Sequence, residues 1–193
     1  MSETTRDLLL STGTDVISQY GYHASGLDLI LKTAGVPKGS FYHYFKSKED
    51  FGLAVIDMFG RQFREKLEAI LLNSTEPPVE RLRTFFKTGK QDLIDADFEK
   101  GCLAGNLGQE LADQNEHFRV RIQEIFVSWQ NVFETCLKQA AAAGELSAVS
   151  DTATMAVFLL SGWEGAILYA KVAKSAAPLD AFMSTAEKLL SVK

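Results

Sequence analysis

Proline is scarce in this chain, and its scarcity limits the possible folds more than any other feature of the sequence. Four of the 193 residues are proline and 14 are glycine. Loop-rich all-β proteins need frequent turns built from these residues, so the low counts favour long uninterrupted helices. A chain of this length with 46% hydrophobic residues can also bury a core without a metal or a disulfide. The sequence therefore predicts an all-α fold.

Apolar residues recur at helical spacing along almost the whole chain, and no segment with β-type alternation competes. Ser25 and Ser47 are expected to cap helices, because each precedes a helical pattern with acidic residues in its first turn. Gly35 and the pair Pro77-Pro78 provide stops. About nine helices are expected, at residues 4–20, 25–35, 38–44, from 48 to a point before Pro77, 79–95, 103–112, 116–143, 152–174 and 179–192.

Charge is unevenly distributed along the chain. The net charge is -5, which argues against a protein whose whole surface binds nucleic acid. No acidic residue lies between Asp28 and Glu49, however, and this segment holds four lysines, Lys32, Lys38, Lys46 and Lys48. Such a run is either a site for a polyanion or a solvated face.

The longest apolar stretch, residues 152–170, is expected to be a buried helix. Glu164 interrupts it and Lys171 closes it, which argues against a membrane span. Two distant cysteines, Cys102 and Cys136, do not make a disulfide framework, and no basic-then-apolar leader precedes the first helical pattern. These features predict a soluble protein of the cytoplasm, with no membrane partner.

Two short predicted helices joined by Gly35-Val36-Pro37 are typical of a helix-turn-helix. In the second of them Phe41 and Phe45 lie four residues apart and are expected to face inward. The other side chains must then face outward, where a cation, hydroxyls and an imidazole can meet base edges and phosphates. These outward residues are Lys38, Gly39, Ser40, Tyr42, His43 and Tyr44. Lys48 is expected to reach the same phosphates.

The pattern Gly-Val-x-x-Gly-x-Phe-Tyr-x-Tyr-Phe-x-x-Lys, from Gly35 to Lys48, resembles the DNA-binding domain of the TetR family of bacterial transcriptional repressors. The resemblance covers residues 4–55. One departure is Gly26, where the family often has a second Ser or Thr. The resemblance implies contacts with double-stranded operator DNA from Ser25, Lys38, Gly39, Ser40, Tyr42, His43, Tyr44 and Lys48.

The resemblance also implies two domains, a helix-turn-helix domain at residues 1–47 and a helical ligand-binding and dimerisation domain at 48–193. The helices 152–174 and 179–192 are assigned to the interface of a homodimer. One face of the former carries Met155, Phe158, Leu159, Gly162 and Ala166, whose small members permit close helix packing. The alternative is that this face packs inside its own subunit.

Cys102 is expected at the entry of a short helix, where backbone N–H dipoles would stabilise a thiolate. The surrounding segment resembles a TetR subgroup that responds to electrophiles and acrylate-like molecules, and this implies sensing by Cys102 and Lys171. The alternative for Cys102 is a small buried apolar side chain. Trp129 and Trp163 are candidates for lining an effector pocket, or else belong to the core.

Other chemistry has little support in the sequence. The three histidines have no metal-ligand spacing, and motifs for phosphate-binding loops or nucleophile elbows are missing, so neither metal nor cofactor is expected. The sequence therefore predicts a ligand-responsive DNA-binding regulator and not an enzyme. It would be a repressor released from a palindromic operator by a small molecule or by modification of a cysteine. The alternative function is a helical thiol-dependent enzyme or small-molecule carrier that does not act on DNA.

Overall fold

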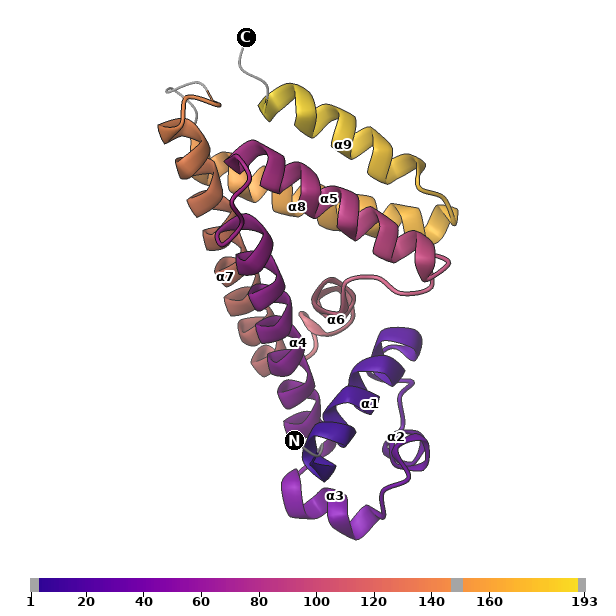
Figure 1. Cartoon of the computed structure of the whole chain (residues 1–193). Helices are drawn as coiled ribbons and strands as arrows, with labels where there is room; N and C mark the ends of the chain where they lie inside the picture. The colour runs from indigo at the N-terminus through magenta and orange to yellow at the C-terminus, as the bar shows by residue number, and fades with distance from the viewer. Residues whose placement is uncertain (1–3, 147–150, 191–193) are drawn as a thin grey trace. The chain divides into compact units, whose positions relative to one another are not determined.

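The computed structural model describes residues 4–146 and 151–190, and this part of the chain forms nine helices and no strand (Figure 1). The all-α prediction is confirmed. The helices are α1 Thr5–Tyr20, α2 Leu27–Ala34, α3 Lys38–Tyr44, α4 Lys48–Leu71, α5 Pro78–Asp95, α6 Leu103–Leu111, α7 Glu116–Ala142, α8 Thr152–Ala173 and α9 Ala177–Leu190.

Most helix ends lie close to the predicted positions, because capping residues mark them. Ser47 does cap α4: the Asp50 N–H donates to its hydroxyl oxygen over 3.0 Å. Helix α5 begins at Pro78, one residue earlier than predicted, since proline fits the first helical position. Helix α4 ends at Leu71, before the predicted stop at the prolines. The predicted end of the last helix, at residue 192, lies outside the described residues.

The chain packs as two compact units, and each is described separately. The first contains residues up to Gln62 together with Cys102–Ile125, so α6 belongs to the same unit as the three N-terminal helices. Its core is formed by apolar side chains with at most 1% exposure, among them Leu9, Ile17, Ile30, Phe41 and Phe51. Burial of such side chains stabilises the unit by roughly 1.5–3 kcal/mol each.

Close approach of α4 to α1 depends on Gly13. A Cβ atom at this position would lie 2.4 Å from Cζ of Phe51 and 3.0 Å from Cγ2 of Val55. Both side chains are fully buried, so neither has room to move away. Gly13 therefore sets the position of Phe51, against which the third helix packs.

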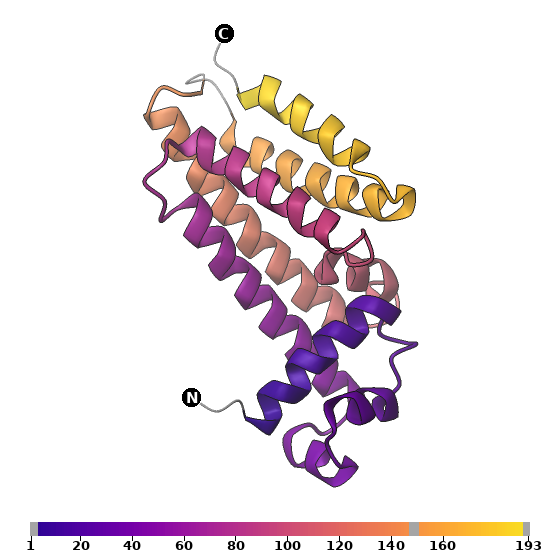
Figure 2. The ribbon, with the colours of Figure 1, turned by 45° about the vertical axis from the view of Figure 1, so that its right-hand side comes forward.

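The second unit contains Phe63–Gly101 and residues from Phe126 onward. An aromatic cluster fills its core, with Trp163 of α8 at ring-centroid distances of 5.1 Å from Phe86 and 5.6 Å from Phe182. Helices α8 and α9 run side by side over much of their length (Figures 1 and 2). Gly162 permits this packing, because a Cβ atom there would lie 2.7 Å from the ring of Phe182.

Helix α9 is held to α5 by ion pairs near both of its ends. Arg83 of α5 bonds to Glu187 of α9 and to Glu80, and Lys90 of α5 lies 2.5 Å from a carboxylate oxygen of Asp180. The bonds from Arg83 hold the pKa of Glu187 below its ordinary value. The pairs are partly exposed, so we expect them to fix the register of α9 more than to add stability.

The prediction of a buried helix is wrong for α8, because only 33% of its most apolar 18 residues are buried. Leu159 and Ala166 of the predicted dimer face are buried within the chain, as the alternative held, whereas Phe158 is 48% exposed. The exposed apolar side chains of α8 are Val157, Phe158, Leu168, Tyr169 and Val172. Among the described helices, α8 alone is long and apolar enough to cross a membrane, but core helices of soluble proteins meet the same test.

Candidate nucleic-acid interface

The turn between α2 and α3 is fixed by a left-handed glycine. Gly35 has φ of 66° and ψ of 26°, and its N–H donates to carbonyl oxygens of the last turn of α2. The Val36 N–H reaches back to the Leu31 carbonyl over 3.1 Å, which completes a Schellman-type end. Glycine adopts this conformation without the steric penalty that a side chain would add. The turn therefore gives α3 one defined direction relative to α2.

Three phenylalanine rings hold α3 against the rest of its unit. Phe41 and Phe45 of this helix segment are 0% and 2% exposed. Their ring centroids lie 5.4 Å and 5.0 Å from that of Phe51 on α4, with edge-to-face geometry in both pairs. Such aromatic pairs add about 0.5–1.5 kcal/mol each beyond the burial of their surface. The inward face predicted from the four-residue spacing is thus confirmed.

The opposite side of α3 is open to solvent. Tyr42 is 55% exposed and Tyr44 is 39% exposed, and Lys38 and His43 are exposed as well. Gly39 is exposed and has free space where a Cβ atom would stand, while Ser40 is half-buried. The predicted outward face therefore exists, and it presents a cation, an imidazole and two phenol groups.

Lys38 has an internal partner that DNA would replace. Its ammonium lies 3.3 Å from a carboxylate oxygen of Asp28, and the two side chains are 59% and 86% exposed. A solvent-exposed pair of this kind contributes only about 0–1 kcal/mol. A phosphate can therefore compete for Lys38 at little energetic cost.

The prediction that Ser25 caps α2 is wrong. Gly26 occupies the cap position and makes no side-chain hydrogen bond, whereas Ser25 is fully buried. The Ser25 hydroxyl donates to the carbonyl oxygens of Gly21 and Val16, at 2.5 Å and 3.2 Å. Ser25 therefore provides a hydrogen-bond donor to carbonyl groups at the end of α1, and we leave it out of the proposed DNA contacts.

Lys48, which is expected to reach DNA phosphates, already has partners within the chain. Its ammonium donates to the backbone carbonyl of Tyr22 over 2.7 Å and to that of His23 over 3.4 Å. The same nitrogen lies 4.4 Å from the centroid of the Tyr22 ring. Burial lowers the pKa of Lys48, while the charge of Glu110 opposes that effect. The lysine therefore braces the α1–α2 turn instead of facing outward.

Sequence reasoning missed a second cation beside α3. The guanidinium of Arg6, on α1, lies 5.5 Å from the centroid of the Phe45 ring, and the residue is exposed. The residues lie 39 positions apart in the sequence, so no local pattern connects them. Arg6 adds positive charge at the end of α3, where a phosphate backbone would pass.

Cys102 caps α6 at its N-terminus, as its predicted place at the helix entry requires. Its sulfur accepts the Gly105 N–H over 3.5 Å, and the residue is 8% exposed. Cys136 is fully buried, its thiol donates to the Pro78 carbonyl, and burial raises its pKa to about 12. Of the two thiols, Cys102 is the one whose sulfur accepts a backbone N–H, that of Gly105.

The tryptophans lie in the core of the second unit. Trp129 is fully buried and its ring centroid is 4.5 Å from that of Phe63, while Trp163 is 2% exposed within the aromatic cluster. Their environment matches the alternative reading, in which they are core residues. Lys171 is half-buried near the end of α8.

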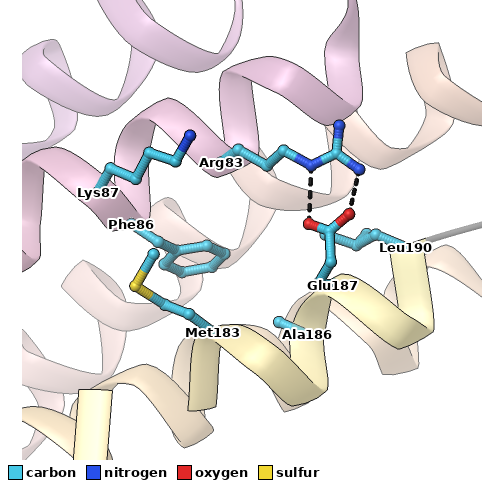
Figure 3. Close-up of a pocket in the computed structure, with 7 residues that line it drawn as sticks. All are labelled: Arg83, Phe86, Lys87, Met183, Ala186, Glu187 and Leu190. Atoms are coloured by element: carbon cyan, nitrogen blue, oxygen red, sulfur yellow. Dashed lines mark hydrogen bonds and ion pairs between the residues drawn. The ribbon is translucent and has the colours of Figure 1, made fainter. Parts of the chain in front are cut away.

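A small pocket of about 240 Å³ lies between α5 and α9 (Figure 3). The ring of Phe86 and the sulfur of Met183 lie close together on one side, and the bonded pair of Arg83 and Glu187 lies on the other (Figure 3). Neither Trp129 nor Trp163 lines this pocket. Within residues 4–146 and 151–190, no group of three or more His, Cys, Asp and Glu side chains is placed to hold a metal ion.

The outward face of α3 and the turn before it define a DNA-binding protein of the helix-turn-helix class. The chain matches the family described as "Bacterial regulatory proteins, tetR family" over residues 9–55. It matches "Tetracyclin repressor-like, C-terminal domain" over residues 78–186, more than half of its length. The chain therefore belongs to the TetR family, as the sequence resemblance implied.

Individual relatives support this assignment along the whole chain. The chain is 40% identical over 177 residues to the Transcriptional regulator AcuR of Cereibacter sphaeroides, covering 92% of this chain and 81% of the relative. It is 34% identical over 179 residues to the HTH-type transcriptional repressor DhaR of Mycobacterium sp. (strain GP1), covering 93% and 88%. The crystal structure of Escherichia coli NemR in its reduced form superposes with a TM-score of 0.90, at 28% identity and 98% coverage of both chains.

Proposed function

We propose that this protein is a ligand-responsive transcriptional repressor that acts by binding duplex DNA and not by catalysis. The observation that supports the proposal is the outward face of α3. This face is open to solvent, while the opposite side of the helix packs through buried phenylalanine rings. Membership of the TetR family supports it, and so do the printed names of the relatives, a transcriptional regulator and a repressor. A protein with this role works in the cytoplasm, where the DNA is.

In the proposed complex, α3 enters the major groove. Gly39 and Ser40 in its first turn permit close approach to base edges, while Lys38 and Tyr42 contact phosphates and fix the register. The first turn of α2 lacks a side-chain cap, so its backbone N–H groups are available to another phosphate. Arg6 and Lys46 extend the positive surface beyond α3.

A homodimer is part of the proposal, and the exposed apolar face of α8 is its interface. Val172 is 74% exposed and Tyr169 is 63% exposed, and both lie on the same helix face as Phe158. Exposed apolar side chains clustered in this way mark a surface that another molecule covers. The two copies of α3 in such a homodimer would bind successive major grooves of a near-palindromic operator, about 34–36 Å apart or slightly more.

The proposed signal is a small electrophile or another ligand that acts at or near Cys102. The thiol caps α6 and faces the N–H of Gly105, so its modification would displace the first turn of that helix. The crystal structure of the similar Escherichia coli NemR is that of its reduced form. Lys171 is a candidate for a second sensing residue beside Cys102, and only the family resemblance supports it.

A binding experiment tests the proposal. The full chain should bind DNA taken from upstream of its own coding sequence, with an affinity that falls steeply as salt rises, at a log-log slope of about -0.9 per phosphate contacted. Alkylation by N-ethylmaleimide should release the DNA from the wild type but not from Cys102→Ser. Cys136→Ser is the matched control, and it should behave like the wild type. Absent or salt-independent DNA binding would favour the carrier or enzyme alternative, and unchanged release in Cys102→Ser would exclude the thiol from sensing.

A further inference from the structure

The turn between α1 and α2 is held by a carboxylate from a distant part of the chain. The N–H of Tyr22 donates to one oxygen of Glu110 over 2.8 Å, and the N–H of His23 donates to the other over 2.7 Å. Glu110 lies in the last turn of α6, 87 residues from His23, and all three residues belong to the first compact unit. Two successive backbone N–H groups that converge on one anion form a concave anion site, here occupied by the protein's own side chain.

A cation holds the carbonyl groups of the same two residues. Lys48 donates to the carbonyls of Tyr22 and His23, and its charge attracts that of Glu110. Hydrogen bonds to ionised groups are roughly twice as strong as neutral ones. The turn is therefore clamped between the start of α4 and the end of α6.

Gly21 makes room for this arrangement. It has φ of +82°, and a Cβ atom there would lie 3.0 Å from an oxygen of Glu110. A side chain at this position would be strained and would also push against the carboxylate. The space left by glycine thus matches the position of Glu110.

Helix α6 connects this clamp to the proposed sensing thiol. It is nine residues long, with Cys102 as its N-terminal cap and Glu110 in its last turn. Its buried residues include Leu107 and Leu111, both 1% exposed. Because the helix is closely packed along its length, we expect any displacement to involve the whole helix. A displacement at one end of so short a helix is transmitted to the other end.

We propose that Glu110 is a positioning residue that couples α6 to the helix-turn-helix by holding the α1–α2 turn through its two carboxylate–amide bonds. The inference rests on the proposed DNA-binding function and names the contact through which α6 acts on it. With the bonds formed, the turn and the start of α2 are ordered for DNA. With the bonds broken, DNA binding must also order the turn, and the affinity falls.

The test uses the full-length variant Glu110→Gln, which keeps the side-chain shape but replaces one accepting oxygen with an NH₂ group and removes the charge. We expect amide hydrogen exchange at Tyr22 and His23 to become about tenfold faster or more, and affinity for a selected duplex to fall about tenfold, as loss of a charge-assisted hydrogen bond implies. Glu116→Gln is the matched control, because this exposed carboxylate bonds only to Arg119 on its own helix. It should change neither quantity.

Reciprocal coupling distinguishes positioning from a merely structural role. If Glu110 couples the two elements, DNA binding should slow amide exchange in residues 103–111 of the wild type and leave it unchanged in Glu110→Gln. Glu110→Asp keeps the charge on a shorter side chain that cannot span both amides, and it should give an intermediate result. This second variant keeps the test decisive if Glu110→Gln fails to fold.

Each outcome separates this proposal from the general one. If the wild type binds no duplex, the proposed function itself fails. If the wild type binds and Glu110→Gln binds equally well or more tightly, Glu110 does not position the helix-turn-helix. If Tyr22 and His23 exchange at the same rate in both proteins, the clamp does not form in solution. Either of the last two results overturns the inference and leaves the DNA-binding function standing.

Discussion

Buried side chains of α3 hold the helix in its unit, whereas exposed side chains of α3 are available to contact DNA. Phe41 is fully buried and Tyr42, its neighbour, is 55% exposed. Because successive residues on a helix point about 100° apart, fixing one of them fixes the direction of the other. The buried phenylalanine thus determines where the exposed tyrosine points, and neither residue alone would make a contact surface.

The two lysines at either side of this surface should respond differently to substitution. Lys38→Met is expected to reduce the salt slope of DNA binding by about one unit, because an exposed cation that meets a phosphate is lost. Lys48→Met should leave the slope nearly unchanged and instead lower the melting temperature, since Lys48 bonds to backbone carbonyls. Titrations at several salt concentrations, with melting curves for both variants, check this. A reduced slope in Lys48→Met would show that Lys48 contacts DNA after all.

The sequence allowed the outward face of α3 to be predicted, because a seven-residue helix with two phenylalanines four apart has one apolar side. The bonds that Ser25 and Lys48 make within the chain could not be predicted, for a shared physical reason. Both bond to backbone carbonyls at or beside the α1–α2 turn. Such bonds depend on the tertiary fold, which the local sequence does not determine. The role of Glu110 has no local signal either, since its partners Tyr22 and His23 lie 88 and 87 residues away in the sequence.

At the scale of helices, two glycines have opposite structural roles. Gly13→Ala should destabilise the protein by about 1–3 kcal/mol, because its Cβ would overlap the buried Phe51 ring. Gly39→Ala should stabilise α3 by about 0.5–1 kcal/mol, since the position is open and helical. It should nevertheless weaken DNA binding, because the added methyl group blocks close approach to the groove. Urea unfolding and DNA titration of both variants separate the effects; equal stability changes would contradict the packing described for Gly13.

Docking of α9 on α5 should depend on pH through Glu187. Arg83 holds the pKa of this carboxylate below 4.5, so its contribution to stability is present above that ordinary value and is lost as pH falls through the lowered one. The carboxylate is 45% exposed, and solvent screening should limit the change in melting temperature to about 1–3 °C. Glu187→Gln should remove this part of the decline below pH 4.5, and Glu99→Gln, an exposed control in the same unit, should not. Parallel declines in wild type and Glu187→Gln would contradict the assignment.

Helix boundaries were largely predictable because caps and prolines are local signals, but the partner of each helix face was not. The periodicity of α8 predicts one apolar face. In the structure, apolar residues lie on two faces of this helix. Leu159 and Ala166 pack within the chain, while Tyr169 and Val172 remain exposed. A helix that is apolar on most sides has no periodic signal to show which side lies inside.

For the whole molecule, the proposed homodimer through the exposed side of α8 would allow two copies of α3 to bind one operator. Val172→Glu should dissociate the proposed dimer without unfolding the chain, because the residue is 74% exposed in the subunit. Val127→Glu, at a 47% exposed position of α7, is the matched control and should remain dimeric. Sedimentation measurements give the state of each variant, and the monomer should lose most of its operator affinity. A dimeric Val172→Glu would place the interface elsewhere.

The outward side of α3 is proposed to lie in the groove of DNA, and mapping of backbone amide chemical shifts locates the bound duplex on the protein. The isotope-labelled protein would be titrated with a duplex selected from a random library, at a salt concentration where binding saturates. The account predicts that the largest shifts fall in residues 38–44 and in the first turn of α2, and that they vanish in a non-selected duplex at the same salt. Shifts that spare residues 38–44, or that centre on α8 or the α5–α9 pocket, would contradict it.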